Sequence, residues 1–141
     1  MDTTRIHRLL LVEDDPARYE FFKRHTAPEF RIVWARSGGT ALAILKRDAP
    51  DDYAGILLDH DLGDQGRGDG FATGQVVARA VAQKIDNSVP VLVHSTNDKG
   101  ATHMVSTLRG ADFDVTRVAF YDLSVERYLA WLTGVFKETV D

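Results

Sequence analysis

The sequence predicts an α/β fold: a five-stranded parallel sheet covered by helices on both faces. Two observations lead to this prediction. Short, continuously apolar runs, typical of strands buried on both faces, alternate along the chain with segments of helical periodicity. Strict alternation of the two favours parallel strands joined by helical crossovers. Since no linker, low-complexity stretch or internal repeat divides the chain, we expect one domain over residues 1–141.

Three of the expected strands are strongly apolar and two are weaker. The strong ones are residues 9–12, 53–58 and 91–93. The weaker ones are residues 31–34, which have a polar start, and 115–119, whose apolar run is interrupted by polar side chains. A polar start is typical of a strand near the edge of a sheet.

Helix signals fill the gaps between these strands. Asp15 followed by Pro16 is an N-cap followed by proline at the first helical position, and it predicts a helix over residues 17–24. Ser37 can cap a second helix that carries several apolar residues. Three more helices are expected over 73–84, over about 101–109 and from about 124 onward, where apolar residues recur at spacings of three and four.

Composition excludes several classes of protein. A hydrophobic content of 44% and a charged content of 27% are ordinary for a globular domain, and no cysteine is present to form disulfides. No apolar run has the length needed to span a bilayer or to serve as a signal peptide. The net charge is −4 and the basic residues are scattered. We therefore expect a cytoplasmic protein with no membrane contact and no bulk DNA binding.

The polar residues that directly follow the apolar strands are the candidates for a functional site. In open α/β sheets, ligands bind outside the carboxyl ends of the strands. Carboxylates packed together there repel by several kcal/mol, on the order of 4 kcal/mol for a pair about 4 Å apart. A hard divalent cation relieves this repulsion, and Mg²⁺ favours carboxylates together with water and phosphate oxygens. The converging groups are Glu13, Asp14, Asp15, Asp59, Asp61, His60 and His94.

Some of these residues also have simpler explanations. Asp15 fits the role of helix cap, and either Asp61 or Asp64 can be a turn residue in the glycine-rich stretch 61–70. A lone histidine after a strand is more often a hydrogen-bonded core or loop residue than a catalyst.

The polar residues after the fourth apolar run carry a geometric constraint. If the strand stays regular, His94 and Ser95 point to opposite faces of the sheet. Ser95 can also be a helix cap, a role for which Asn97 and Asp98 compete.

With these motifs in place, the chain resembles the receiver domains of response regulators. The resemblance rests on residues 9–16, 35–42, 56–59 and 90–95. It implies a flavodoxin-like, three-layer fold with strand order 2-1-3-4-5. It further implies that Glu13 and Asp14 hold Mg²⁺, that Asp59 is a third ligand and the nucleophile toward phosphorus, and that Ser95 takes the place of a switch hydroxyl.

The chain departs from typical receivers in two ways. Typical receivers carry a Lys-Pro pair after the fifth strand, whereas residues 116–121 contain neither lysine nor proline. Arg117 is a candidate to replace the lysine as the cation, although the planar guanidinium of arginine binds anions differently from the compact ammonium group of lysine. In addition, His60 and His94 stand where typical receivers have apolar residues.

These departures resemble the cyclic-phosphate-processing branch of the receiver superfamily. The matching motifs are residues 59–63, Thr73-Gly74, residues 93–97, Gly100 and Met104. The resemblance implies action on a cyclic phosphodiester rather than phosphoryl relay.

Three functions follow as hypotheses. The first is metal-dependent hydrolysis of a cyclic phosphate, on a small phosphate-containing ligand or a nucleic-acid end. In it, His60 or His94 moves protons. The second is an atypical receiver phosphorylated on Asp59 by a histidine kinase, and the third is a non-catalytic interaction module. For the first, we expect Mg²⁺ or another divalent cation on Glu13, Asp14, Asp59 and Asp61, catalysis by Asp59, His60, His94 and Ser95, and phosphate contacts from Ser95, Asn97 and Arg117.

Overall fold

The computed structural model describes residues 6–62 and 72–140, and it confirms the predicted fold class. Five parallel strands are ordered β2-β1-β3-β4-β5. The stretch 63–71, including Asp64 and most of the glycine-rich loop, lies outside the described residues. The elements are β1 (His7–Val12), α1 (Pro16–His25), β2 (Phe30–Ala35), α2 (Gly38–Arg47), β3 (Gly55–Leu58), α3 (Gly74–Lys84), β4 (Val91–Val93), α4 (Asp98–Gly110), β5 (Val115–Arg117), the short 3₁₀ turn η2 (Phe120–Asp122) and α5 (Val125–Val140).

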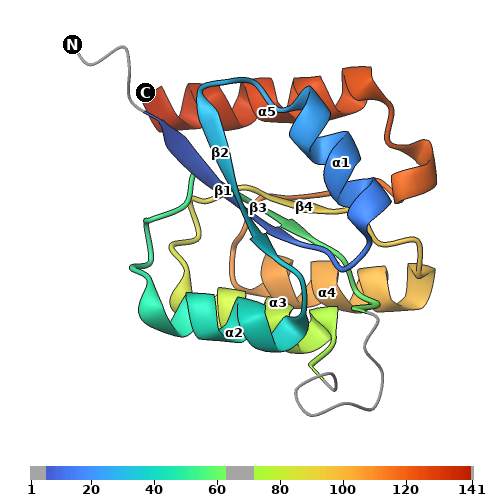
Figure 1. Ribbon diagram of the computed structural model, residues 1–141. Helices are drawn as coiled ribbons and strands as arrows, with labels where there is room; N and C mark the ends of the chain where they lie inside the picture. The colour runs from blue at the N-terminus through green and yellow to red at the C-terminus, as the bar shows by residue number, and fades with distance from the viewer. Residues whose placement is uncertain (1–5, 63–71, 141) are drawn as a thin grey trace.

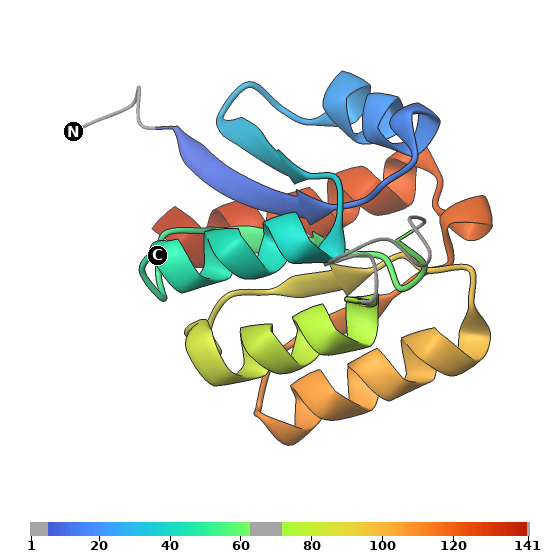
Figure 2. The same cartoon turned by 60° about the horizontal axis from the view of Figure 1, so that its bottom comes forward.

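Helices cover both faces of the sheet (Figure 1). Helices α1 and α5 lie on one face, and α2, α3 and α4 lie side by side on the other (Figure 2). Two apolar clusters fill the spaces between these layers. None of the described helices combines the length and apolar character that crossing a bilayer requires.

Strand alternation divides the core between the two layers. On β1, Leu9 and Leu11 pack toward α1 and α5, whereas Leu10 and Val12 pack toward α2 and α3. The central strands are buried on both faces, which is why their sequences are continuously apolar.

The predicted boundaries differ from the observed ones at several element ends, some of which are longer and some shorter than expected. β1 starts at His7 rather than at residue 9, because parallel pairing with β2 continues through His7 and Arg8. β3 starts only at Gly55, and β5 ends at Arg117. Helix α4 starts three residues before the predicted position, because Asn97 caps it.

Candidate functional site

Three neighbouring strands each place a polar side chain on the same face of the sheet, directly beyond their carboxyl ends. The last leucines on the α1/α5 face of β1, β3 and β4 are in register with one another. Two residues further along each strand, the same face carries a polar group, as a period of two requires. The leucines are Leu11, Leu57 and Leu92, and the polar residues beyond them are Glu13, Asp59 and His94.

Glu13 and His94 form a buried pair. Nε2 of His94 lies 2.7 Å from Oε1 of Glu13, and both side chains are fully buried. The second carboxylate oxygen, Oε2, accepts a hydrogen bond from the backbone N–H of Asp15 at 3.0 Å. Trp34 Nε1 donates to the Glu13 backbone carbonyl at 2.6 Å. Both the side chain and the backbone of Glu13 are therefore held in place.

Burial sets the protonation of this pair. It lowers the pKa of His94 to about 4 and raises the pKa of Glu13, because the charged form of each group loses hydration. His94 is therefore a neutral ring near pH 7, with Nε2–H placed to donate to the Glu13 carboxylate. Its other nitrogen, Nδ1, is buried and has no hydrogen-bond partner among the described residues. The ring packs edge-on against Phe22, with 5.0 Å between ring centroids.

Asp59 lies beside this pair and also lines a hollow at the edge of the sheet. Oδ1 accepts from the backbone N–H of His60 at 2.8 Å, and Oδ2 lies 3.6 Å from Nη1 of Arg18. Burial raises the pKa of Asp59 to about 6, with the charge of Glu13 adding to the shift, while His94, the His60 N–H and Arg18 act in the opposite direction. The carboxyl therefore titrates close to neutral pH.

Two sets of groups near Asp59 can hold a cation. In the buried set, ligand atoms of Glu13, Asp59 and His94 lie within 4.8 Å of one another, so this cluster could bind a metal ion. In that set, both Glu13 oxygens are already engaged by internal donors.

The outer set is made of oxygens only. Asp14, Asp59 and Asp61 line a hollow of about 380 Å³. Burial, and next the neighbouring Glu13, raise the pKa of Asp14. Carboxylate oxygens beside open space for water are the environment that Mg²⁺ prefers. The hollow is completed by Asp15, Pro16, Arg18 and Thr96.

His60 is held at the edge of this site by the start of α4. Its Nδ1 lies 2.8 Å from Oδ1 of Asp61, and the same oxygen accepts from Asn97 Nδ2 at 3.2 Å. The His60 bond is the main cause of the lowered pKa of Asp61. A Cβ on Gly100 would lie 2.5 Å from the His60 ring, so only glycine allows the helix to approach this closely.

The start of α3 supports the backbone of Asp59 from the other side. The N–H of Gly74 donates to the His60 carbonyl at 2.8 Å. A Cβ on Gly74 would lie 2.1 Å from the Asp59 carbonyl oxygen. This glycine permits close backbone packing directly behind the carboxylate.

The other predicted site residues have different surroundings. Ser95 is buried, and its Oγ accepts from the backbone N–H of Asn97 at 3.0 Å. Asn97 caps α4, with its Oδ1 accepting from the Gly100 N–H at 2.9 Å, and Asp15 caps α1, accepting from the Ala17 N–H at 2.8 Å. The simpler explanation for Asp15 is therefore correct.

Arg117 does not line the hollow that contains Asp59. Its Nη2 donates to the Ser95 carbonyl at 3.0 Å and to Oδ1 of Asp98 at 2.8 Å. Strand alternation explains this position: two residues earlier, Val115 packs in the apolar cluster under α4, so Arg117 projects to the same side. The missing lysine is therefore not replaced from β5 in this conformation.

Among residues 6–62 and 72–140, the cation that forms an ion pair with Asp59 is Arg18, which the sequence reasoning did not single out. It lies in the first turn of α1, three residues after the capping Asp15, whose Oδ2 is 3.9 Å from its Nε. One signal could have identified it: a helix that begins directly after an acidic strand end points its first turn at the site.

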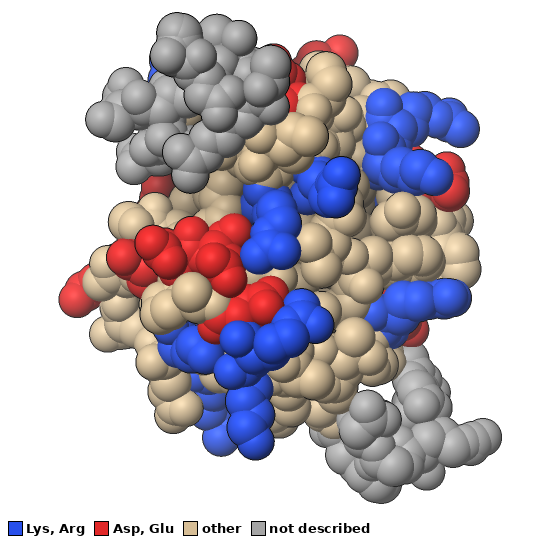
Figure 3. Space-filling model, turned by 60° about the vertical axis from the view of Figure 1, so that its left-hand side comes forward, with Lys and Arg blue, Asp and Glu red and all other residues tan. Residues whose placement is uncertain are grey.

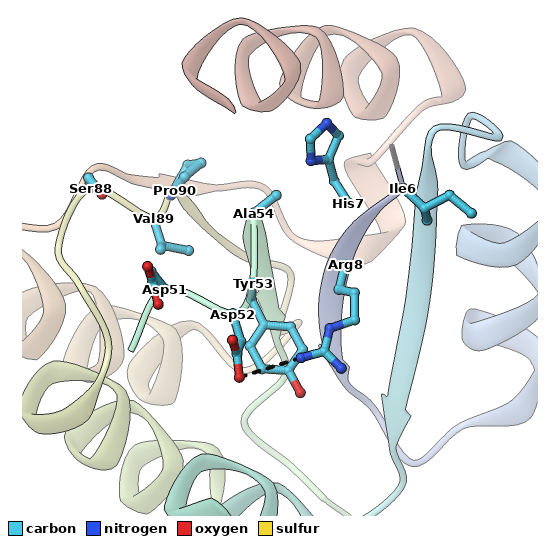
Figure 4. Close-up of a pocket in the computed structure, with 10 residues that line it drawn as sticks. All are labelled: Ile6, His7, Arg8, Asp51, Asp52, Tyr53, Ala54, Ser88, Val89 and Pro90. Carbon is cyan, nitrogen blue, oxygen red and sulfur yellow. Dashed lines mark ion pairs between the residues drawn. The ribbon is translucent and has the colours of Figure 1, made fainter. Parts of the chain in front are cut away.

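A larger hollow, of about 490 Å³, lies at the amino ends of β1 and β3 (Figure 4). Its cation is already paired, since Arg8 lies 3.6 Å from Asp52 and stacks on the Tyr53 ring at 4.8 Å. On the side of the molecule where β1 begins, acidic and basic side chains lie in adjacent patches (Figure 3). Neutralised pairs of this kind give less reason for a ligand than the acidic hollow at the opposite edge of the sheet.

Comparison with known families identifies the fold and the branch. Residues 8–110 match the model of the cyclic-phosphate processing receiver domain. The chain belongs to this family. No curated protein matches it.

Solved structures share the architecture at low sequence identity. A CheY-like response regulator receiver domain from Methanospirillum hungatei JF-1 superposes with a TM-score of 0.71 at 15% identity, covering 95% of this chain and 97% of that one. The receiver domain of sensor histidine kinase PA1611 from Pseudomonas aeruginosa PAO1, with a magnesium ion coordinated in its active-site cleft, gives 0.66 at 18% identity, covering 92% and 96%. The non-phosphorylated HemR receiver domain from Leptospira biflexa gives 0.64 at 23% identity, covering 92% and 93%. At these identities the likeness establishes the fold alone.

Proposed function

We propose that this receiver-like domain binds a divalent cation in its acidic hollow and hydrolyses a cyclic phosphate or phosphodiester there. The observation that carries the proposal is the position of Asp59, which lines the hollow together with Asp14 and Asp61. The family match and the magnesium-bound receiver domain of PA1611 give this proposal further support.

The cation would be held by Asp14, Asp59 and Asp61. Glu13, which is buried beside Asp59, would contribute its negative charge without direct contact. Bound Mg²⁺ supplies positive charge against a phosphate oxygen. The fit is supported because the three carboxylates line one hollow, and burial raises the pKa of Asp14 and of Asp59, so a cation would favour their charged forms. Glu13 is the least available ligand of the four, because its two oxygens already accept from His94 and from the Asp15 N–H.

The two histidines would have different roles. The contact of His60 Nδ1 with Asp61 favours the tautomer that carries hydrogen on Nδ1 and leaves the lone pair on Nε2. Nε2 can then take the proton of the attacking water as its oxygen bonds to phosphorus. His60 then donates this proton to the oxygen of the cyclic phosphate ring whose bond to phosphorus breaks. His94, which is fully buried and bonded to Glu13, positions that carboxylate instead.

The polar residues around α4 would complete the site. Asn97 donates from its amide nitrogen to Oδ1 of Asp61, the oxygen that also contacts His60, so it orients that carboxylate. Ser95 supports the same turn through the Asn97 N–H. Arg117 would act on phosphate only after leaving Asp98, which makes it the weakest of the proposed phosphate contacts.

The test is turnover of a nucleoside 2′,3′-cyclic monophosphate, with the monoester product followed by ³¹P NMR. We expect Mg²⁺-dependent hydrolysis that Asp59→Asn abolishes and His60→Ala lowers by about 10²-fold or more. His103→Ala, which changes an exposed histidine on α4, is the matched control and should keep full activity. The proposal fails if wild type shows no turnover, or if His60→Ala and His94→Ala both keep full activity.

Phosphorylation of Asp59 is a second candidate, favoured by the same position of Asp59 in the lining of the hollow. In that reaction the carboxylate oxygen bonds to phosphorus and the bond to the donor's leaving group breaks, with a histidine kinase as the natural donor class. The absence of lysine from residues 116–121 counts against it. Acetyl phosphate with Mg²⁺ should then add the mass of one phosphoryl group to wild type and none to Asp59→Asn. An unchanged mass for wild type would exclude this candidate.

A further inference from the structure

We propose that Arg18 is the anion-binding residue of the acidic hollow, and that its guanidinium pairs with a phosphate oxygen of the ligand. This inference rests on the proposed function, since it needs a phosphate beside the cation held by Asp14 and Asp59. It assigns the role that Arg117 was expected to have to a residue on a different element.

The contacts of Arg18 leave its donors available. Nη1 lies 3.6 Å from Asp59 and Nε lies 3.9 Å from Asp15. Both distances exceed the 2.7–3.2 Å or so of an N–H···O hydrogen bond. Within the described residues, the guanidinium makes these ion pairs and a ring contact but donates no hydrogen bond. Arg117, in contrast, donates two hydrogen bonds to α4 and the turn before it.

The position of Arg18 is electrostatically unfavourable for the helix itself. The first turn of a helix has a positive potential, so an arginine there opposes the dipole. A capping Asp15 and Pro16 at the start of α1 fix where that first turn begins. A negative partner beyond the helix end therefore offsets an unfavourable interaction with the helix dipole.

Phe120 gives the guanidinium a fixed support. The Arg18 Cζ lies 5.0 Å from the centre of the Phe120 ring. That ring is packed edge-on against Phe21 at 5.4 Å and Phe22 at 5.9 Å between centroids. Because the ring cannot move freely, the planar guanidinium is pre-oriented toward the hollow, which lowers the entropy lost when it binds an oxyanion in bidentate geometry.

The effect of Arg18 on cation affinity should have opposite signs with and without phosphate. Without phosphate, both are drawn to Asp59, so Arg18 weakens cation binding. With phosphate, Asp59 holds the cation while the guanidinium pairs with the anion, so the two act together. This reversal of sign distinguishes an anion-binding arginine from one that only stabilises the fold.

The experiment measures Mg²⁺ binding and inorganic phosphate binding separately, by NMR chemical shift titration of the full chain. The variants are Arg18→Gln and Arg18→Lys, with Arg117→Gln as the matched control. With saturating Mg²⁺, we expect Arg18→Gln to weaken phosphate binding about tenfold or more, since two charge-assisted hydrogen bonds are lost. Arg18→Lys should recover part of the loss, and Arg117→Gln should bind phosphate as wild type does. Without phosphate, Arg18→Gln should bind Mg²⁺ as tightly as wild type or more tightly.

Two results would overturn the inference: equal phosphate affinity in wild type and Arg18→Gln, or a larger loss in Arg117→Gln. Wild type that binds Mg²⁺ but no phosphate would overturn it as well. Absence of Mg²⁺ binding to wild type would instead contradict the proposed function. In that case phosphate titrated into metal-free wild type and Arg18→Gln decides the role of Arg18 by itself.

Discussion

Nε2 of His94 and Oε1 of Glu13 lie 2.7 Å apart beneath the acidic hollow, and both side chains are fully buried. Removing one member of such a pair leaves the other without compensation in a low-dielectric environment. We expect His94→Leu to lower the free energy of unfolding by about 3–5 kcal/mol, as measured by urea denaturation.

The matched control for this prediction is His103→Leu on the exposed face of α4. It should change stability by no more than about 0.5 kcal/mol. Equal stability of His94→Leu and wild type would mean that the buried pair contributes nothing beyond the packing of the ring.

The dependence of stability on pH gives a second prediction, for metal-free protein. The His94 pKa falls from 6.5 to about 4 on folding, so acidification from pH 6.5 toward 4 protonates the unfolded state first and lowers stability. The Asp59 pKa rises from 3.8 to about 6, so acidification from pH 6 toward 4 protonates the folded state first and raises stability. These two contributions oppose each other in wild type.

Asp59→Asn should therefore lose more stability than wild type when the pH falls from 6.5 to 4. His94→Leu should lose less than wild type, or gain stability, over the same range. Urea denaturation at several pH values in the presence of a chelator measures both. Parallel curves for all three proteins would contradict the assigned pKa shifts.

Cation binding should also depend on pH, because protons compete for Asp59. With its pKa near 6, the carboxylate fraction at pH 5 is about one tenth of that at pH 7 or above. We expect Mg²⁺ affinity, measured by calorimetry, to fall about tenfold between pH 7.5 and pH 5. An affinity that is constant over this range would show that Asp59 is not a ligand.

Two glycines in helices should respond differently to substitution by alanine. A Cβ on Gly74 would lie 2.1 Å from the Asp59 carbonyl oxygen, so Gly74→Ala must displace the backbone behind the carboxylate. We expect a loss of about 1–3 kcal/mol in unfolding free energy together with weaker Mg²⁺ binding. Gly134→Ala in α5, where nothing lies within 4 Å of the added Cβ, should raise stability by up to about 1 kcal/mol and leave Mg²⁺ binding unchanged. Similar effects of the two variants would contradict this account.

The fold was predictable from the sequence because its signals are local. The apolar runs of β3 and β4 and the caps of α1 and α2 each depend on neighbouring residues, and the strand order followed from the family resemblance. A single domain over residues 1–141 stays a prediction. The boundaries were less accurate where polar residues such as His7 and Arg8 continue a strand through backbone pairing alone.

The site was predictable only in part, because its contacts are between elements. Period-two alternation places Glu13, Asp59 and His94 on one face, and the same rule applied to β5 would have placed Arg117 under α4. The ion pair between Arg18 and Asp59 joins α1 to the end of β3, and no periodic pattern in the sequence indicates it. The pairing of His94 with Glu13 depends in the same way on the register of three strands.

The guanidinium of Arg18 also has a consequence for the stability of the acidic hollow. Many clusters of carboxylates stay disordered or partly unfolded until an ion arrives, because their mutual repulsion has no internal relief. Here an arginine from the first turn of α1 serves as a tethered counterion for Asp59. We therefore expect the domain to fold to the same architecture without a metal ion, so that under the proposed function metal availability would control activity and not folding.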